Sequence, residues 1–157
     1  MTSAACRHDA HKPRSGAIGP GPLRYDGRMA SSEALTRGIR VQVQAQFSPE
    51  HSHPHQSRWF FLYTVNISNE SDDTVQLVTR HWIISDASGH VEEVRGPGVI
   101  GQQPVLEPGQ SFEYTSGCPL ASPYGAMRGT YQMITADGSQ FDAEIAEFVL
   151  RAPFTVH

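Results

Sequence analysis

The sequence predicts an all-β protein, an antiparallel β-sandwich of seven or eight strands, and three observations carry this prediction. Short runs alternate apolar and polar residues with the period of two that is typical of half-buried strands. Turn residues recur every eight to fifteen positions. No stretch keeps the 3.6-residue apolar period of an amphipathic helix. Antiparallel strands joined by short turns bury one face each by packing as two sheets.

The first two predicted strands have the clearest alternation. In residues 39–47, Val41, Val43 and Ala45 alternate with glutamines, so one face is apolar and the other polar. In residues 59–68 the alternate positions that we expect to face the core are Trp59, Phe61, Tyr63, Val65 and Ile67. A turn through residues 69–73 follows.

The third predicted strand, residues 75–85, has apolar residues on both parities. Leu77 and Ile83 lie on one parity and Trp82 and Ile84 on the other. We expect this strand to be central in its sheet or to contain a bulge near Arg80. A turn at residues 86–89 leads to a short polar strand at 90–94, and a strand near 112–115 follows the turn at 106–109.

Two further strands complete the predicted sandwich. Met127, Tyr131 and Met133 alternate with polar residues, and the hydroxyl of Tyr131 is a candidate for a tyrosine-corner hydrogen bond to the backbone. The last strand covers residues 141–150. Its inward parity shifts near Ile145, which predicts a β-bulge there.

The amino-terminal part of the chain differs in composition from the rest. Residues 1–36 are rich in Gly, Pro, Ser and Ala and have no sustained apolar period, so we expect a disordered extension followed by one domain at residues 37–157. Met29 stands shortly before the first predicted strand. We therefore hypothesise that the natural chain starts at Met29, which amino-terminal sequencing of the native protein would test.

Charge and composition exclude several classes of function. Residues 1–38 hold six Arg and Lys against three Asp and Glu, whereas residues 39–157 hold six Arg against thirteen Asp and Glu. An acidic domain with scattered arginines disfavours nucleic acid as a partner. No run of about 18 apolar residues is present, and residues 1–20 lack a signal-peptide core, so we expect neither a membrane partner nor secretion. Two cysteines with no evident pairing fit a cytoplasmic location.

The segment 95–104 contains a GxGxxG spacing, formed by Gly96, Gly98 and Gly101. In dinucleotide-binding folds this spacing opens a helix, but Pro104 follows so closely that no helix can form here. Two interpretations remain open. The loop could bind an anion or pyrophosphate through its backbone amides with Arg95 supplying a positive charge, or the glycines could only allow the backbone to turn.

Two other groups of residues are candidate binding sites. His51, His53 and His55 alternate in a loop beside Glu50 and could hold a divalent metal if the loop folds around it; the alternative is a solvated loop. Phe60 and Leu62 lie on the polar parity of the second strand and form a candidate interface, unless the protein itself covers them.

The sequence shows no catalytic constellation. Asp86, Glu92, Glu93 and Asp142 fall at outward or turn positions, and His81 in mid-strand is typical of a hydrogen-bonded structural residue. No nucleophile elbow or paired cysteine and histidine is visible, so we expect no enzymatic activity.

Residues 39–157 resemble the ApaG family. The resemblance depends on Arg80-His81-Trp82 with Ile84 and Asp86, the glycine segment 94–104, Pro108-Gly109, the segment 114–117, the segment 127–133, and the closing residues 153–157. Pro97 stands where the family usually has an acidic residue, and Cys118 where it usually has a small apolar one. The first departure weakens any proposal that the loop ligates a cation.

The resemblance implies an immunoglobulin-like or fibronectin type III-like sandwich and a role in binding. The same module occurs in certain F-box proteins and in a mitochondrial protein that interacts with a DNA polymerase, which implies protein partners. The bacterial family is associated with cobalt and magnesium tolerance and with diadenosine tetraphosphate. We therefore expect a non-enzymatic module that presents the Phe60 and Leu62 face and the loop at residues 96–101 to a protein partner or to a second copy of itself, and that needs no cofactor. The alternative is a sensor of divalent metal or nucleotide polyphosphate.

Overall fold

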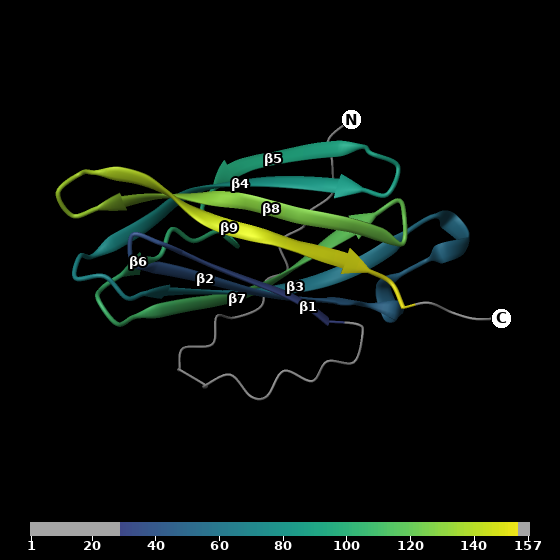
Figure 1. Ribbon diagram of the computed structural model, residues 1–157, viewed down its shortest axis with the longest axis horizontal. Helices are drawn as coiled ribbons and strands as arrows, with labels where there is room; N and C mark the ends of the chain where they lie inside the picture. Colours follow the sequence, from purple (N-terminus) through teal and green to yellow (C-terminus); the bar gives the residue numbers. More distant parts are fainter. Residues whose placement is uncertain (1–28, 154–157) are drawn as a thin grey trace.

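The computed structural model describes residues 29–153 and shows two antiparallel β-sheets packed face to face (Figure 1). The predicted all-β sandwich is therefore confirmed. The first sheet has the strand order β1 (Met29–Thr36), β2 (Ile39–Phe47), β3 (Trp59–Asn69) and β7 (Ser111–Leu120). The second has the order β5 (Val91–Pro97), β4 (Val75–Asp86), β8 (Tyr124–Thr135) and β9 (Gln140–Arg151).

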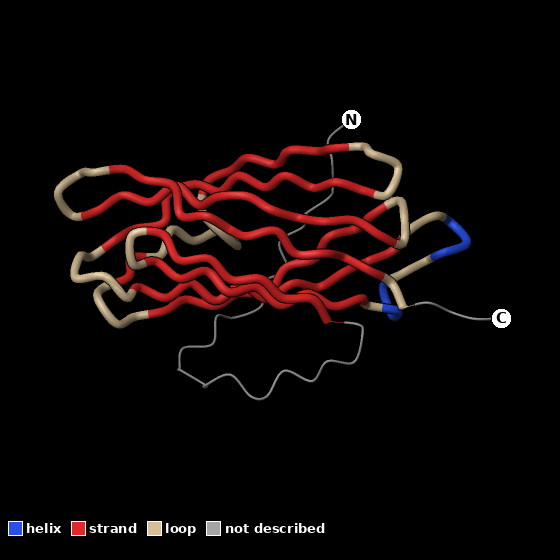
Figure 2. The backbone as a smooth tube through the Cα atoms, in the orientation of Figure 1, coloured by secondary structure: helices blue, strands red, loops and turns tan. Residues whose placement is uncertain are grey.

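Three short elements complete the chain that the structure describes. The two-residue strand β6 (Val105–Leu106) pairs with the start of β4. Between β2 and β3, the chain forms the single-turn 3-10 helices η1 (Pro49–His51) and η2 (Pro54–Gln56), visible as the blue segments of Figure 2. None of the helices within residues 29–153 has the length and apolar character needed to cross a membrane.

The core lies between the two sheets and is centred on Trp82. Its indole packs edge-on against the rings of Tyr63, Tyr131 and Phe148, with centroid distances of 5.4, 6.2 and 6.0 Å. Burying a side chain of this size stabilises the fold by about 1.5–3 kcal/mol. Because these rings come from both sheets, they hold the sandwich together.

A hydrogen bond between two tyrosines satisfies the polar atoms of this core. The hydroxyl groups of Tyr114 and Tyr131 are 2.5 Å apart and buried. Burial raises the pKa of Tyr131 well above its usual value. This side-chain partner replaces the backbone partner that the tyrosine-corner hypothesis expected.

Both predicted β-bulges are present. The register of β4 against β8 shifts between Leu77 and Thr79, so the inward parity changes and Arg80 points to the same side as Trp82. The register of β8 against β9 shifts opposite residues 145–148, where we expected the second bulge. The strand β4 is also central in its sheet, because it pairs with β5 on one side and with β8 on the other.

The predicted domain boundary was wrong by eight residues, and the strand count was low. Residues 29–36 form β1, which pairs along its whole length with β2. Its small and polar residues hid it, since an edge strand that is only half buried needs few apolar side chains. The structure describes nine strands, of which β1 and the very short β6 were not expected. Residues 1–28 lie outside the described residues.

Contacts between β1 and β9 close one side of the sandwich. The backbone amide of Glu144 donates to Thr36 Oγ1 at 3.1 Å, and the guanidinium of Arg37 lies 4.7 Å from the ring centre of Phe141. The other side of the sandwich lies between the edge strands β5 and β7.

Candidate functional site

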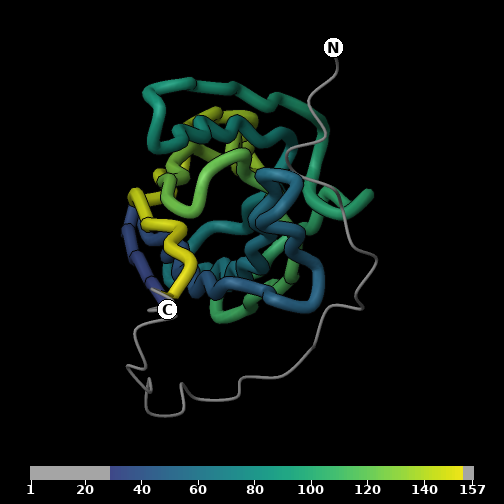
Figure 3. The backbone as a smooth tube through the Cα atoms, turned by 90° about the vertical axis from the view of Figure 1, so that its right-hand side faces the viewer, coloured from purple at the N-terminus to yellow at the C-terminus, as the bar shows by residue number. Residues whose placement is uncertain are grey.

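Three connections meet at one end of the sandwich and enclose a cleft. They are the η1–η2 segment, the β4–β5 turn and the β7–β8 turn, which appear together on the right of Figure 1 and face the viewer in Figure 3. The cleft has a volume of about 710 Å³. Its lining comprises Glu50, His51, His53, Gln56, Ser57, Arg58, Phe60, Ile84, Asp86, His90, Glu92, Pro119, Leu120 and Ala121.

Two buried serines fix the η1–η2 segment at the edge of the cleft. Ser52 Oγ donates to the carbonyl of Ser48 at 2.7 Å and accepts from the amide of Phe60 at 2.8 Å. Ser48 Oγ lies 2.7 Å from His51 Nδ1, which holds the imidazole in place. These short side-chain contacts replace the regular ladder that a strand would provide.

Phe60 forms an aromatic wall of the cleft. Its ring lies over Gly117, where a Cβ atom would come within 2.2 Å of Phe60 Cζ, so only glycine leaves room for it. The imidazole of His51 lies 5.4 Å from the same ring. Phe60 is half-buried, and its remaining surface faces the cleft beside Pro119 and Leu120.

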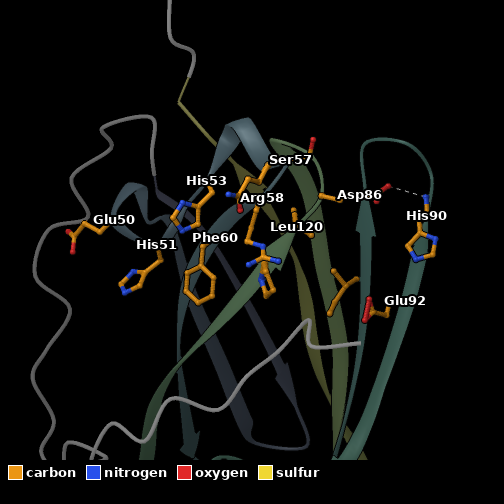
Figure 4. A pocket seen from close by; sticks show the side chains of 14 residues that line it. Glu50, His51, His53, Ser57, Arg58, Phe60, Asp86, His90, Glu92 and Leu120 are labelled. Atoms are coloured by element: carbon orange, nitrogen blue, oxygen red, sulfur yellow. Dashed lines mark hydrogen bonds between the residues drawn. The ribbon is translucent and has the colours of Figure 1, made fainter. Parts of the chain in front are cut away.

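The ionisable residues of the cleft stand on two sides. Figure 4 shows Glu50, His51 and His53 on one side, Asp86, His90 and Glu92 on the other, and Arg58 between them. No ion pair joins the guanidinium of Arg58 to a carboxylate in residues 29–153. Fixed charges of opposite sign therefore line the cleft without neutralising one another.

The two carboxylates on the β4–β5 side differ in their hydrogen bonds. Asp86 Oδ1 accepts from Ser88 Oγ at 2.6 Å and from the amides of Ser88 and His90, and these bonds, the Ser88 hydroxyl first, lower the pKa of Asp86. Glu92 Oε2 is buried and has no hydrogen-bond partner among residues 29–153. Glu92 pairs with Ile84 across the strands and so points to the inward side of the sheet. The outward position expected for Glu92 was wrong.

The three loop histidines do not converge. His51 is held by Ser48, and His53 joins Arg58 through backbone hydrogen bonds of 2.7 and 3.1 Å. His51 and His53 line the cleft, whereas His55 is not part of its lining. Nowhere in the described chain do three His, Cys, Asp or Glu side chains lie close enough to hold a metal ion.

The glycine segment lies further along β5 and uses its own amides. Gly98 donates to the carbonyl of Val78 at 2.8 Å, and Val99 and Gln102 exchange hydrogen bonds of 2.8 and 2.9 Å. The side chain of Val99 is fully buried. Gly98 has φ +60°, and a Cβ atom there would come within 2.2 Å of the Gln102 carbonyl oxygen. These contacts give the segment a structural role.

The cation at this loop is Arg80 instead of Arg95. Arg80 Nη1 donates to the carbonyls of Pro97 and Gly98 at 3.0 and 2.9 Å, and its guanidinium covers Gly96. Arg95 is paired with His81 in register, on the opposite face from Gly96, and its guanidinium lies 3.6 Å from Glu93. His81 Nε2 is 2.7 Å from the same carboxylate, as expected for a structural histidine.

Of the sequence-predicted residues, the structure brings only three to the cleft: Phe60, His51 and His53. Leu62, half-buried on the same face of β3, is not in the lining, and Gly101 is in the separate glycine loop. Sequence reasoning missed Arg58 and Glu92. One signal for Glu92 was present, because it shares parity with Val94 and Gly96 in β5.

Comparison with known proteins gives consistent matches. A family model described as ApaG domain matches residues 49–135, which include every residue that lines the cleft and the glycine segment. Relatives named Protein ApaG from Beijerinckia indica and from a Methylobacterium strain are 53% and 57% identical over 121 residues, 77% of this chain and 93% of each relative.

Solved structures match as well. A crystal structure from Bordetella pertussis, described as an ApaA protein, is 50% identical with a TM-score of 0.72 and covers 74% of this chain and 95% of that one. An X-ray structure of a structural genomics target is 40% identical with a TM-score of 0.71, covering 79% of this chain and 94% of that one.

Proposed function

Because this chain belongs to the ApaG domain family, we propose that it is a non-enzymatic interaction module that binds a protein partner through the cleft. One observation carries the proposal. The cleft walls present an aromatic ring, a guanidinium that forms no ion pair within residues 29–153, and a buried carboxylate oxygen that has no hydrogen-bond partner there. Folding usually satisfies buried polar groups, so an unsatisfied carboxylate oxygen at a concave surface favours binding.

The chemistry of the cleft favours binding over catalysis. The Ser48 hydroxyl that contacts His51 belongs to a buried residue, and in the described chain no carboxylate is hydrogen-bonded to that imidazole. A nucleophile needs both access to substrate and an oriented base. The Ser48–His51 contact therefore supports the loop conformation instead of a reaction.

The alternative function, binding of a divalent metal or a nucleotide polyphosphate, has less support. The loop histidines do not come together, and three amides of the glycine segment are already donated within the protein. Titration calorimetry with Co²⁺, Mg²⁺ and diadenosine tetraphosphate tests it directly. Binding of any of them at micromolar concentration would favour this alternative over the interaction module.

Affinity isolation from native lysate tests the proposed function. We compare the full chain with Phe60→Ser and with Val105→Ser, an equally apolar-to-polar change at an exposed residue distant in the fold. The expected result is one partner that is recovered by the wild type and by Val105→Ser and is lost with Phe60→Ser. Thermal melting of each variant checks that loss of binding is not loss of the fold.

Two results would contradict the cleft as the binding surface. Recovery of the same partner by all three proteins would show that Phe60 is not at the interface. Loss of the partner with Leu62→Ser but not with Phe60→Ser would instead place the interface on the outer face of β3, away from the cleft.

A further inference from the structure

The unpartnered oxygen of Glu92 indicates which chemistry the cleft recognises. Glu92 lies on edge strand β5, opposite Ile84, and its side chain points inward, into the cleft. Oε2 is buried and accepts no hydrogen bond from any residue that the structure describes. An anionic oxygen removed from water without a donor is unfavourable, and a donor brought by a ligand would remove that cost.

The net charge around the cleft has the sign that attracts a cation. Glu50, Asp86 and Glu92 contribute three carboxylates, and Arg58 is the only fixed positive charge in the lining. The Asp86 carboxylate stays ionised because its hydrogen bonds lower its pKa. Residues 29–153 carry seven Arg against fourteen Asp and Glu, so the long-range field also attracts a positive partner.

Arg58 does not cancel this preference, because the two charges differ in exposure. Arg58 is exposed, so water and salt screen its guanidinium, whereas Glu92 Oε2 is buried. Electrostatic interactions are stronger where water is excluded. The Glu92 carboxylate, which has one buried oxygen, therefore has more influence on a ligand inside the cleft than the exposed guanidinium of Arg58.

The opposite wall is suited to a planar cation. The ring of Phe60 packs on Gly117 and lies 5.4 Å from the tilted imidazole of His51, and its free surface lines the cleft. A guanidinium group stacks on aromatic faces and donates in a fork to a carboxylate. One arginine side chain can therefore stack on Phe60 and donate to the Glu92 carboxylate at the same time.

We propose that the cleft binds an arginine side chain from an exposed segment of a partner protein, with its guanidinium donating to Glu92 and packing against Phe60. This inference rests on the proposed interaction function and names the partner chemistry of the same site. Arg58 then remains available for a carbonyl or carboxylate next to that arginine in the partner segment.

Nuclear magnetic resonance titration of the full chain with two blocked peptides tests this inference. The peptides have the same sequence of glycine and alanine around one central residue, which is arginine in the first and citrulline in the second. Citrulline keeps the shape and removes the charge. We expect the arginine peptide to shift the amide signals of Phe60, Ile84 and Glu92 and to bind about tenfold more tightly than the citrulline peptide.

Two variants give a matched control. Glu92→Gln and Glu93→Gln remove the same charge from neighbouring residues of β5, but Glu93 faces the outer side, where it contacts His81. We expect Glu92→Gln to weaken arginine-peptide binding about tenfold and Glu93→Gln by less than about twofold. Equal effects of the two variants, or equal binding of both peptides, would overturn the proposal.

Two further outcomes separate this inference from the function on which it rests. If Glu92→Gln still recovers the lysate partner while Phe60→Ser loses it, the cleft binds a protein but not through an arginine. If the Glu92 signal shifts with protein concentration in the absence of peptide, the occupant is a second copy of this chain. Either result overturns the partner arginine and leaves the interaction module in place.

Discussion

The glycine loop and the cleft are supported by the same two strands, β4 and β5, yet they treat polar groups in opposite ways. At the loop, Arg80 donates to two carbonyls, and the amides of Gly98 and Val99 have partners within the protein. At the cleft, Glu92 lies four residues from Gly96 along β5, about 13 Å away, and its Oε2 has no hydrogen-bond partner within the described part of the chain. The glycine loop, which has the recognisable motif, is therefore the region whose polar groups already form hydrogen bonds within the protein.

Whether polar groups are paired within the protein distinguishes a structural motif from a binding surface. A motif whose donors and acceptors are paired internally stabilises the fold and has little left for a ligand. A surface that keeps buried groups unpaired costs stability unless a partner satisfies them. Substitutions at the loop should therefore reduce stability, while substitutions at the cleft should reduce binding with little effect on stability.

The largest loss of stability is expected for Gly98→Ala. Its φ of +60° disfavours any residue with a Cβ atom, and that atom would collide with the Gln102 carbonyl oxygen at 2.2 Å. We expect the free energy of unfolding to fall by about 3 kcal/mol, measured by urea denaturation. Gly101→Ala is the control, because Gly101 has φ +77° but open space around it, and should cost about 1 kcal/mol. Equal losses would show that collision with the loop is unimportant.

Arg80→Met tests the cation of the loop and should have the next largest effect. The substitution keeps an apolar stem but removes the two hydrogen bonds to the carbonyls of Pro97 and Gly98. We expect a loss of about 1–3 kcal/mol in unfolding free energy. Arg128→Met, at an exposed position of β8, should change it by about 0.5 kcal/mol or less. A stability unchanged by Arg80→Met would mean that the loop does not depend on this residue.

The sequence predicted the fold better than it predicted the glycine loop or the cleft. The fold depends on patterns among neighbouring residues, whereas the loop and the cleft depend on contacts between distant ones. Alternation in residues 39–47 and 59–68 fixed which faces are buried, because parity depends only on neighbouring residues. Arg80 was missed as the cation of the loop because Arg95 is next to the glycines in the sequence, whereas Arg80 reaches them only through the pairing of β4 with β5. The cleft was missed because its lining comes from β3, β4, β5, β7 and a loop, whose meeting no local pattern encodes.

Raising the pH tests whether water reaches the core at Tyr131, which is the cross-strand neighbour of Arg80. Burial raises the pKa of folded Tyr131 above 10, so above pH 10 the unfolded chain loses this proton and the folded chain keeps it. The unfolding free energy should then fall with pH by at most about 1.4 kcal/mol per pH unit from this group. Tyr131→Phe should show a shallower fall than Tyr124→Phe, whose ring is exposed. Identical slopes would indicate that water reaches Tyr131.

The smallest stability effect is expected for Glu92→Gln, and it is the sharpest test of the comparison. The carboxylate has a buried oxygen without a donor, so neutralising it removes an unfavourable charge and breaks no hydrogen bond in the described chain. Because Glu92 is only partly buried, the gain should be about 0.5 kcal/mol or less, by urea denaturation. Glu93→Gln, which loses its charged contact with His81, should not stabilise the protein. A loss above about 1 kcal/mol for Glu92→Gln would mean that Glu92 supports the fold as Arg80 does, and the contrast between cleft and loop would disappear.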